Sequence, residues 1–264
     1  MSEKKERKVI SISRRVEMVG FYPEKIVHFL QKKCRPERVH TLVFWTKHPE
    51  NLLSHHKLNR VVREYDHLFI HLTITGMGGT DLEPGIPDPD RVIGLLPELV
   101  ALVKNPERIR VRFDPVVQLK TDTGRTYSNL SHYEKIAEAA ADVHINTLVF
   151  SWMQHYPKVK KHLLTRGYTQ VEVTPGRRRQ QWQQLSERSK KAGVTLKGCC
   201  EEGVETAACI DGKLLTRLHP RKIQASTARA GGQRLLCHCT KSWDIGWYYP
   251  CPGGCIYCYA NPAL

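Results

Sequence analysis

Short apolar runs alternate with stretches of helical periodicity along most of the chain. The runs are four to eight residues long and rich in β-branched residues, which is typical of buried strands. They cover residues 9–13, 41–46, 68–75, 109–113, 145–150 and 194–197. Helical spacing of apolar residues predicts helices over residues 21–33, from about 49, over 129–141 and over about 180–191. Asp88-Pro89 looks like the start of a further helix, and Gly193 looks like a helix end.

About six such βα units predict an α/β fold with a parallel sheet and helices outside it, most simply a partial (β/α)6 TIM-type barrel. Sites in this kind of fold lie at the carboxyl ends of the strands. Polar residues at those ends include Arg14, Arg15, Thr46, Lys47, Thr73, Thr75, Arg112, Asp114, Ser151, Glu201 and Glu202. Any one of them could simply satisfy loop backbone groups, but their repeated placement after apolar runs favours a site.

The stretch 203–247 lacks long periodic segments and is rich in Gly, Lys and Arg. We interpret it as an irregular extension across the barrel mouth, with a basic loop over about 218–234. The predicted organisation is therefore a partial barrel over 1–202, a basic extension over 203–241, and a final strand and cysteine loop over 242–264. No internal repeat is present, and 264 residues suit one large domain better than two small ones.

Charge and cysteine usage narrow the class of protein. The chain has 41 Lys and Arg against 26 Asp and Glu, and a formal charge of +15 favours an anionic partner such as nucleic acid. Each basic cluster taken alone could be a solvated helix face. The first residues form no apolar signal segment and no run reaches membrane length, so we expect a cytoplasmic protein without a membrane partner. In a reducing compartment, the nine cysteines are better explained as metal ligands than as disulfides.

Three of these cysteines form the most informative motif. Cys251, Cys255 and Cys258 are spaced by three residues and then two, on a loop opened by Pro252 and a Gly-Gly pair. Such a loop can place three thiolates on a [4Fe-4S] cube and leave the fourth iron open for an external ligand. A zinc knuckle is the alternative, although zinc spacings usually come as two Cys pairs.

This motif resembles that of the radical S-adenosylmethionine (SAM) superfamily, and its CIYCYA sequence is similar to the branch that contains spore photoproduct lyase. Thr46-Lys47, the stretch Glu83-Pro-Gly-Ile-Pro87 and the strand that begins Arg112-Phe-Asp-Pro resemble further segments of that branch. There the cluster loop follows the first barrel strand, whereas here it comes last. Circular permutation accounts for this if residues 242–249 supply the strand before the loop. The chain also resembles, nearly end to end, an uncharacterised bacterial family with ISISRR, FWTK, RFDP and a C-terminal CxxxCxYCYA.

The resemblance implies an enzyme that cleaves SAM to a 5′-deoxyadenosyl radical and abstracts hydrogen from a substrate. It implies Lys47 as the contact of the SAM carboxylate, with Thr73, Thr75, Glu83 and Arg112 as further cofactor contacts. Arg14, Arg15, Tyr22 and Cys200 are candidate catalytic residues. The stretch 11–17 lacks the hydrogen-donating cysteine of the lyase, so either Cys34, Cys200 or Tyr22 replaces it or the chemistry is different.

Partners follow from the same comparison. A reducing donor such as flavodoxin or ferredoxin is expected. A damaged or modified base in DNA or RNA is the expected substrate, and a small anionic metabolite or a peptide is the alternative. A different class of protein, a zinc-containing nucleic-acid-binding module without catalysis, also stays open.

A second group of cysteines precedes the main motif. Cys199 or Cys200, with Cys209, Cys237 and Cys239, could supply four thiolates to an auxiliary iron–sulfur cluster or to zinc. The bacterial family has a Cys-x-Glu-Glu stretch that favours Cys199 over Cys200. Alternatively, Cys199 or Cys200 is a buried apolar residue, and Cys237 and Cys239 are loop thiols that bind no metal.

Overall fold

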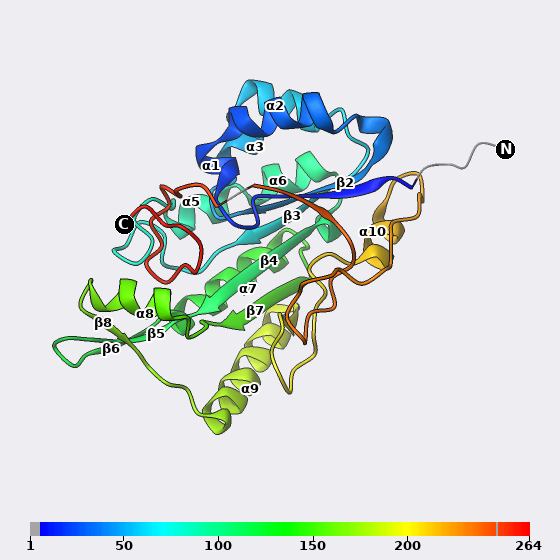
Figure 1. Cartoon of the computed structure of the whole chain (residues 1–264). Coiled ribbons are helices and arrows are strands. Elements are labelled where there is room, and N and C mark those ends of the chain that lie inside the picture. The colour runs from blue at the N-terminus through cyan, green and yellow to red at the C-terminus, as the bar shows by residue number, and fades with distance from the viewer. Residues whose placement is uncertain (1–5, 247) are drawn as a thin grey trace.

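A seven-stranded parallel sheet forms the centre of the molecule, which a computed structural model describes over residues 6–246 and 248–264 (Figure 1). In chain order its strands are β1 (Lys8–Ile12), β2 (Val39–Thr46), β3 (Leu68–Thr73), β4 (Ile109–Val116), β7 (Thr147–Trp152), β9 (Thr195–Gly198) and β10 (Trp243–Ile245). Their order across the sheet is β10-β1-β2-β3-β4-β7-β9, and every neighbouring pair is parallel. The last strand of the chain is therefore the edge strand beside the first. In the described residues β10 and β9 do not pair with each other.

The helices that connect the strands are α1 (Met18–Phe21), α2 (Pro23–Lys33), α3 (Glu50–Ser54), α4 (His56–Val62), α5 (Pro89–Gly94), α6 (Leu96–Val103), α7 (Tyr133–Asp142), α8 (Pro157–Leu164), α9 (Pro175–Ala192) and α10 (Gly212–Leu218). Short 3-10 turns cover Pro36–Arg38, Pro106–Arg108 and Asn129–His132. Within the described residues, none of these helices combines the length and the apolar character that a membrane span requires.

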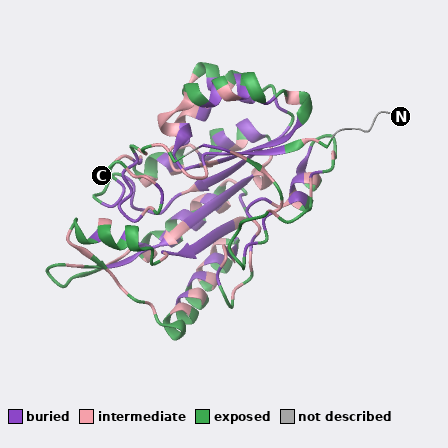
Figure 2. Cartoon of the chain, viewed as in Figure 1, coloured by how far each residue is buried: buried purple, intermediate pink, exposed green. Residues whose placement is uncertain are grey.

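Both faces of the sheet are covered. Along β2 and β3, Leu42, Phe44 and Leu72 pack into the main core beneath the helices, whereas Val43 and Phe69 point to the other face. Figure 2 shows the strands buried and the outer sides of the helices exposed. Because the strands lose water on both faces, they appear in the sequence as nearly continuous apolar runs.

Most predicted elements are present, and their ends have the expected causes. Asp88 caps α5 by accepting from the Asp90 amide at 2.8 Å, and Gly193 ends α9 with a φ of +77°. The helix predicted from about residue 180 begins five residues earlier, because Thr174 caps it. The single helix expected from about residue 49 is two helices, divided at His55.

The extension lies differently from the prediction. It contains the unpredicted helix α10 and covers the sheet face of Val9, Val43 and Phe69. Part of the basic loop reaches the amino ends of the strands, where the Ile223 carbonyl accepts a hydrogen bond from His40 Nε2 at 2.8 Å. Figure 1 shows α10 near the end of the sheet where the strands begin and the C-terminal segment near the end where they finish. The extension therefore runs along the sheet as well as near the carboxyl ends.

A small antiparallel sheet was also absent from the prediction. It consists of β5 (Gln118–Thr121), β6 (Thr126–Ser128) and β8 (Tyr168–Gln170), in the order β6-β5-β8. It continues from the end of β4 and lies beside α8.

Candidate functional site

The loop of Cys251, Cys255 and Cys258 lies on the side where the parallel strands end (Figure 1). Two consecutive turns shape it, with the Gly254 amide donating to the Cys251 carbonyl at 3.2 Å and the Cys258 amide to the Cys255 carbonyl at 3.0 Å. The Cys251 amide donates to the Asn261 carbonyl at 2.7 Å, which closes the base of the loop. Three thiols are thus presented by one compact, internally bonded segment.

The loop after β3 supports this segment. The Gly85 amide donates to the Gly253 carbonyl at 3.2 Å, and the Ile256 amide donates to the Leu82 carbonyl at 3.1 Å. A Cβ on Gly85 would lie 2.2 Å from the Pro252 carbonyl oxygen, so only glycine permits this approach. A Cβ on Gly253 would lie 3.4 Å from Cys251 Sγ, so this glycine leaves space beside the sulfur atom. A second apolar cluster, which includes Met77, Leu82, Ile86, Ile256 and Tyr257, fills the space beneath the two loops.

A buried polar network joins the cysteine loop to β2. Lys47 Nζ lies 2.6 Å from Glu83 Oε1 and 2.8 Å from the Tyr257 hydroxyl. Thr75 donates to the same Glu83 oxygen at 2.8 Å, and Tyr257 donates to it as well. Burial works against the charged ammonium, but Glu83, together with Cys255 and Asp114, outweighs it and raises the pKa of Lys47. Three predicted cofactor contacts, Lys47, Thr75 and Glu83, therefore lie together beside the cysteines.

Glu17 is a functional candidate that sequence reasoning missed. Its carboxylate accepts from the Lys47 amide at 2.6 Å, from the Thr46 hydroxyl at 2.8 Å and from the Gly20 amide at 3.2 Å. It thereby fixes the end of β2 just where Lys47 leaves the strand. The only sequence signal was an acidic residue soon after the first strand end.

The three thiols form a donor set that suits an iron–sulfur cluster. Burial raises the pKa of the Cys255 thiol well above its ordinary value, and the nearby Lys47 ammonium acts in the opposite direction. Burial also raises the pKa of the Cys251 and Cys258 thiols. In the described residues no three His, Cys, Asp or Glu side chains converge on one metal-ion position. This is compatible with a cube, because each cysteine of a [4Fe-4S] site binds a different iron.

The candidate catalytic residues near β1 border this loop. Arg14 and Arg15 both lie near Asp244 Oδ2, with NH1 at 3.6 and 3.3 Å, and the Arg14 guanidinium lies 4.8 Å from the Trp45 ring centroid. Tyr22 donates to the Pro250 carbonyl at 2.6 Å, directly before Cys251. The Tyr22 hydroxyl is therefore an anchor of the cysteine loop.

Arg112 lies apart from the Lys47 network. Its guanidinium is 5% exposed, pairs with Asp114 and donates to Cys209 Sγ at 2.9 Å. Ser151 donates to the same Asp114 carboxylate. Thr73 is the neighbour of Arg112 across β3 and β4. Arg112 thus reaches the second cysteine group.

The second cysteine group is brought together by the fold. Cys199 Sγ and Cys209 Sγ are 3.5 Å apart. Cys209, Cys237 and Cys239 belong to one buried cluster, and Cys199 and Cys200 pack against it. The thiols of this group therefore lie in the same region of the fold, and a shared metal site remains a prediction.

Other candidates are not brought to the cysteine loop. Cys34 ends α2 near the amino end of β2 and is buried there, and its carbonyl accepts from the Tyr65 hydroxyl. Its thiol is therefore remote from the carboxyl ends of the strands. Glu201 is buried and accepts from the Trp152 amide at 3.0 Å, and burial raises the pKa of Glu201 to about 7. Glu202 is exposed.

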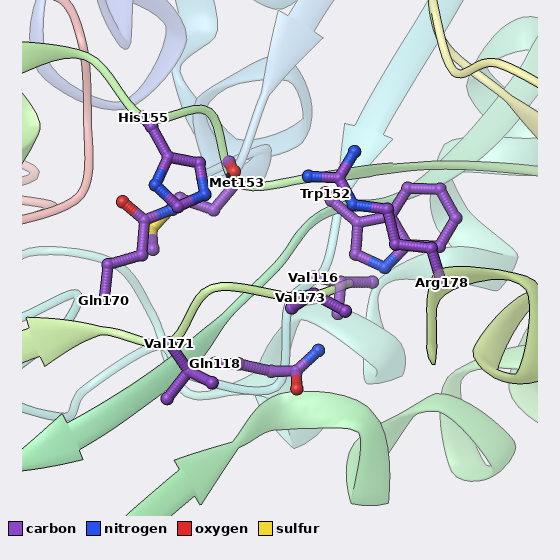
Figure 3. Close-up of a pocket in the computed structure, with 9 residues that line it drawn as sticks. All are labelled: Val116, Gln118, Trp152, Met153, His155, Gln170, Val171, Val173 and Arg178. Carbon is purple, nitrogen blue, oxygen red and sulfur yellow. Dashed lines mark hydrogen bonds between the residues drawn. The ribbon is translucent and has the colours of Figure 1, made fainter. Parts of the chain in front are cut away.

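A small pocket lies between the end of β4 and the start of α9 (Figure 3). The Arg178 guanidinium lies 5.3 Å from the centroid of the Trp152 ring at its rim. The remaining lining residues are Val116, Gln118, Met153, His155, Gln170, Val171 and Val173. No residue predicted to bind cofactor or metal lines this pocket.

Exposed tyrosines near the cysteine loop were also missed. Tyr259 follows Cys258, is 51% exposed and lies 5.9 Å from Tyr156, ring to ring. Tyr248 is 54% exposed, and the Arg15 guanidinium lies 5.7 Å from its ring centroid. Aromatic rings beside cations are suited to stacking on nucleobases.

Comparison with protein families supports one assignment. The family model for a domain of unknown function, DUF1848, matches residues 15–260. Searches of the curated proteins and of the solved structures found no match to the chain. The matched residues run from the end of β1 through the whole cysteine loop, so the chain belongs to the DUF1848 family.

Proposed function

We propose that this protein is a radical SAM enzyme in which Cys251, Cys255 and Cys258 hold a [4Fe-4S] cluster. The observation that carries the proposal is the position of the three-thiol loop, which is fixed against the carboxyl ends of β2 and β3 through Lys47, Glu83 and Tyr257. When bound, the cluster would supply the electron that cleaves SAM to methionine and a 5′-deoxyadenosyl radical.

A circularly permuted partial barrel is the fold that fits this function. The strand before the cysteine loop, β10, pairs with β1 in parallel register, with Ile10 opposite Trp243. It therefore occupies the place that a first strand would take in an enzyme whose cluster loop comes early in the chain. Trp247, within the stretch 242–249 predicted to lead into the loop, lies outside the described residues.

The residues around the loop have separable tasks in this proposal. Lys47 would place a positive charge beside the three thiolates and reach the SAM carboxylate by exchanging its Glu83 partner. Glu83 and Tyr257 would hold the loop in position, with Thr75 as a further support. Glu17 would orient Lys47 through its backbone amide.

Nucleic acid is the substrate class that we propose. The formal charge of +15, the exposed tyrosines 156, 248 and 259 and the nearby cations of Arg14 and Arg15 support it. A base that reacts with a radical must leave its stack, which favours single strands or damaged duplex. A small anionic metabolite or a peptide is the alternative substrate.

Cys255→Ala tests the cluster. Wild-type protein reconstituted anaerobically should bind about four irons per chain through these thiols and cleave SAM on reduction. Cys255→Ala should lose SAM cleavage, because one of three cluster ligands is gone. Cys34→Ala removes a cysteine that is buried elsewhere and should retain both properties.

Two results would contradict the proposal. Retained SAM cleavage in Cys255→Ala would exclude Cys255 as a cluster ligand. Colourless protein with zinc at Cys251, Cys255 and Cys258, and without iron or sulfide, would indicate the zinc-containing nucleic-acid-binding module instead.

A further inference from the structure

Five of the nine cysteines lie together outside the cluster loop. Cys199 and Cys200 follow β9, Cys209 comes ten residues after Cys199, and Cys237 and Cys239 come from the far end of the extension. Cys199 Sγ and Cys209 Sγ are in contact, and all five cysteines belong to one buried cluster or pack against it. Thiols from three separate stretches of chain have therefore been brought to one place.

The closest pair has the spacing of two ligands on one ion. Thiolates that each lie about 2.3 Å from a tetrahedral zinc are about 3.8 Å apart. Cys199 Sγ and Cys209 Sγ are 3.5 Å apart. Within the described residues no three of these side chains surround one metal-ion position. An ion bound by four thiols would require the other side chains to turn toward the Cys199–Cys209 pair.

Buried cations around these thiols call for a negative charge. Arg110 is 7% exposed, donates to the Ala208 carbonyl at 2.7 Å and forms no ion pair with a carboxylate among the described residues. Arg112 donates to Cys209 Sγ, and Arg234 NH2 lies 3.9 Å from Cys199 Sγ. An unpaired buried cation is costly. Four thiolates on one divalent cation carry a net charge of −2, which these guanidinium groups would offset.

The backbone at Cys209 is also held in place. His71 Nε2 donates to the Cys209 carbonyl at 2.8 Å, and the His71 ring stacks on Trp45 with centroids 4.2 Å apart. The Ile210 amide donates to Cys239 Sγ at 3.4 Å. These contacts fix the backbone at Cys209 and the position of the Cys239 sulfur atom relative to it.

The extension around these cysteines has little regular structure of its own. Apart from the seven residues of α10, residues 203–241 form only turns and isolated bridges. A metal that joins the start and the end of such a segment would fix it against the sheet, because metal binding then contributes directly to folding. The position of the cysteines, at both ends of the segment, suits that task.

We propose that Cys199, Cys209, Cys237 and Cys239 bind a single zinc ion that holds the extension on the sheet. Binding converts four thiols to thiolates and releases four protons to solvent, with no change in oxidation state. Cys200, the fifth cysteine, is not a ligand in this site. The proposal is independent of the iron–sulfur function, since it uses none of the cysteines of the C-terminal loop.

Metal content tests the site in a background without the cluster loop. Protein with Cys251, Cys255 and Cys258 all changed to Ala, loaded with Zn²⁺ and desalted, should retain about one zinc per chain. Adding Cys209→Ser should abolish retention, whereas adding Cys34→Ala or Cys200→Ser should preserve it. Zinc unaffected by Cys209→Ser, zinc lost with Cys200→Ser, or iron and sulfide retained in the triple variant would each overturn the proposal.

A second measurement uses the wild-type chain and needs no variant to fold. Co²⁺ in place of zinc should give thiolate-to-cobalt charge-transfer bands of a four-thiolate site, even after the C-terminal thiols are occupied by the reconstituted cluster. Zn²⁺ should also protect Cys209 and Cys239 from alkylation, and a chelator should make 203–241 sensitive to protease. Absence of the cobalt bands, or alkylation independent of zinc, would also overturn it.

Discussion

Glu83 connects the segments that form the candidate site. It is 1% exposed, and one of its oxygens receives hydrogen bonds from Lys47, Thr75 and Tyr257. These donors come from the end of β2, the loop after β3 and the cysteine loop. Glu83 therefore joins these three segments, and it is one of the groups that raise the pKa of Lys47.

Gly85→Ala tests the contact between the loop after β3 and the cysteine loop. In Gly85→Ala the new Cβ would lie 2.2 Å from the Pro252 oxygen and 3.0 Å from Gly253 Cα, both of them backbone atoms that cannot rotate away. Overpacking of this kind typically lowers the free energy of unfolding by about 1 to 3 kcal/mol. Urea denaturation should show that loss, and iron bound after reconstitution should fall with it.

Gly176→Ala is the matched control. Gly176 lies in the first turn of α9, and a Cβ there would meet no atom within 4 Å. Alanine favours a helix over glycine by up to about 1 kcal/mol, so this variant should be at least as stable as wild type and should bind iron normally. Equal behaviour of the two variants would show that the contact between Gly85 and Pro252 is not needed.

The parallel strands could be predicted because burial on both faces of the sheet leaves unbroken apolar runs. The main helices could be predicted from the spacing of their apolar residues. The strands β5, β6 and β8 could not, since each is only three or four residues long and is largely solvent-accessible on one side. Helix α10 was missed because its seven residues are too few for a helical period to stand out.

Part of the candidate site could likewise be predicted from the sequence, and part could not. Cysteine spacing predicts which thiols belong together, and the second group lies in and against one buried cluster, while its metal binding stays a prediction. The ion pair of Lys47 with Glu83 could not be predicted, because it joins two loops whose separation depends on the whole sheet. Arg112 has the right position after a strand, but its side chain turns toward Cys209.

Three histidines, His40, His67 and His219, lie where helix α10 meets the amino ends of β2 and β3. Their burial predicts that stability depends on pH. His67 and His219 are buried with their rings 5.4 Å apart, and burial lowers the pKa of His67 to about 2 and that of His219 to about 4. The unfolded chain binds protons on these rings below about pH 6.5, but the folded chain does not. Their contribution to stability is therefore complete above pH 6.5 and is lost as the pH falls, by about 1.4 kcal/mol per pH unit for each histidine.

His67→Gln should reduce this acid sensitivity. Between pH 6 and pH 4 the slope of unfolding free energy against pH should be smaller than in wild type by about 1.4 kcal/mol per pH unit. Chemical denaturation at several pH values measures the slope. His28→Gln, on the exposed side of α2, should leave it unchanged. An unaltered slope in His67→Gln would mean that His67 becomes protonated in the folded protein.

The excess of positive charge on the molecule predicts that binding to DNA or RNA weakens as the salt concentration rises. The logarithm of affinity for DNA or RNA should fall by about 0.7 to 0.9 per phosphate contact for each log unit of salt. Titrations with single-stranded, duplex and ultraviolet-irradiated DNA, and with RNA, measure this slope. Binding weaker than about 10 μM to all of them at low salt, without stimulation of SAM cleavage, would leave a small anionic metabolite or a peptide as the better substrate.

Variants of two lysine pairs test which surface of the protein binds nucleic acid. Lys160 and Lys161 are exposed on α8, a helix whose Lys158 contacts Asn261 beside the cysteine loop at 2.7 Å. Lys190 and Lys191 are exposed at the end of α9, which leads to the amino end of β9. Changing the first pair to Ala should weaken binding and reduce the salt slope. Changing the second pair, which removes the same charge, should have little effect.

The place of β10 in the sheet also bears on how the protein is made. At about 5 to 20 residues per second, β1 leaves the ribosome on the order of tens of seconds before Cys251. Throughout that time the edge of β1 that later receives β10 has its hydrogen-bonding groups open, as an edge strand able to pair with another chain. The C-terminal thiols arrive after the strands that support them, so in the proposed function iron would enter a nearly finished molecule. The same late step that completes the cysteine loop also covers this edge of the nascent sheet.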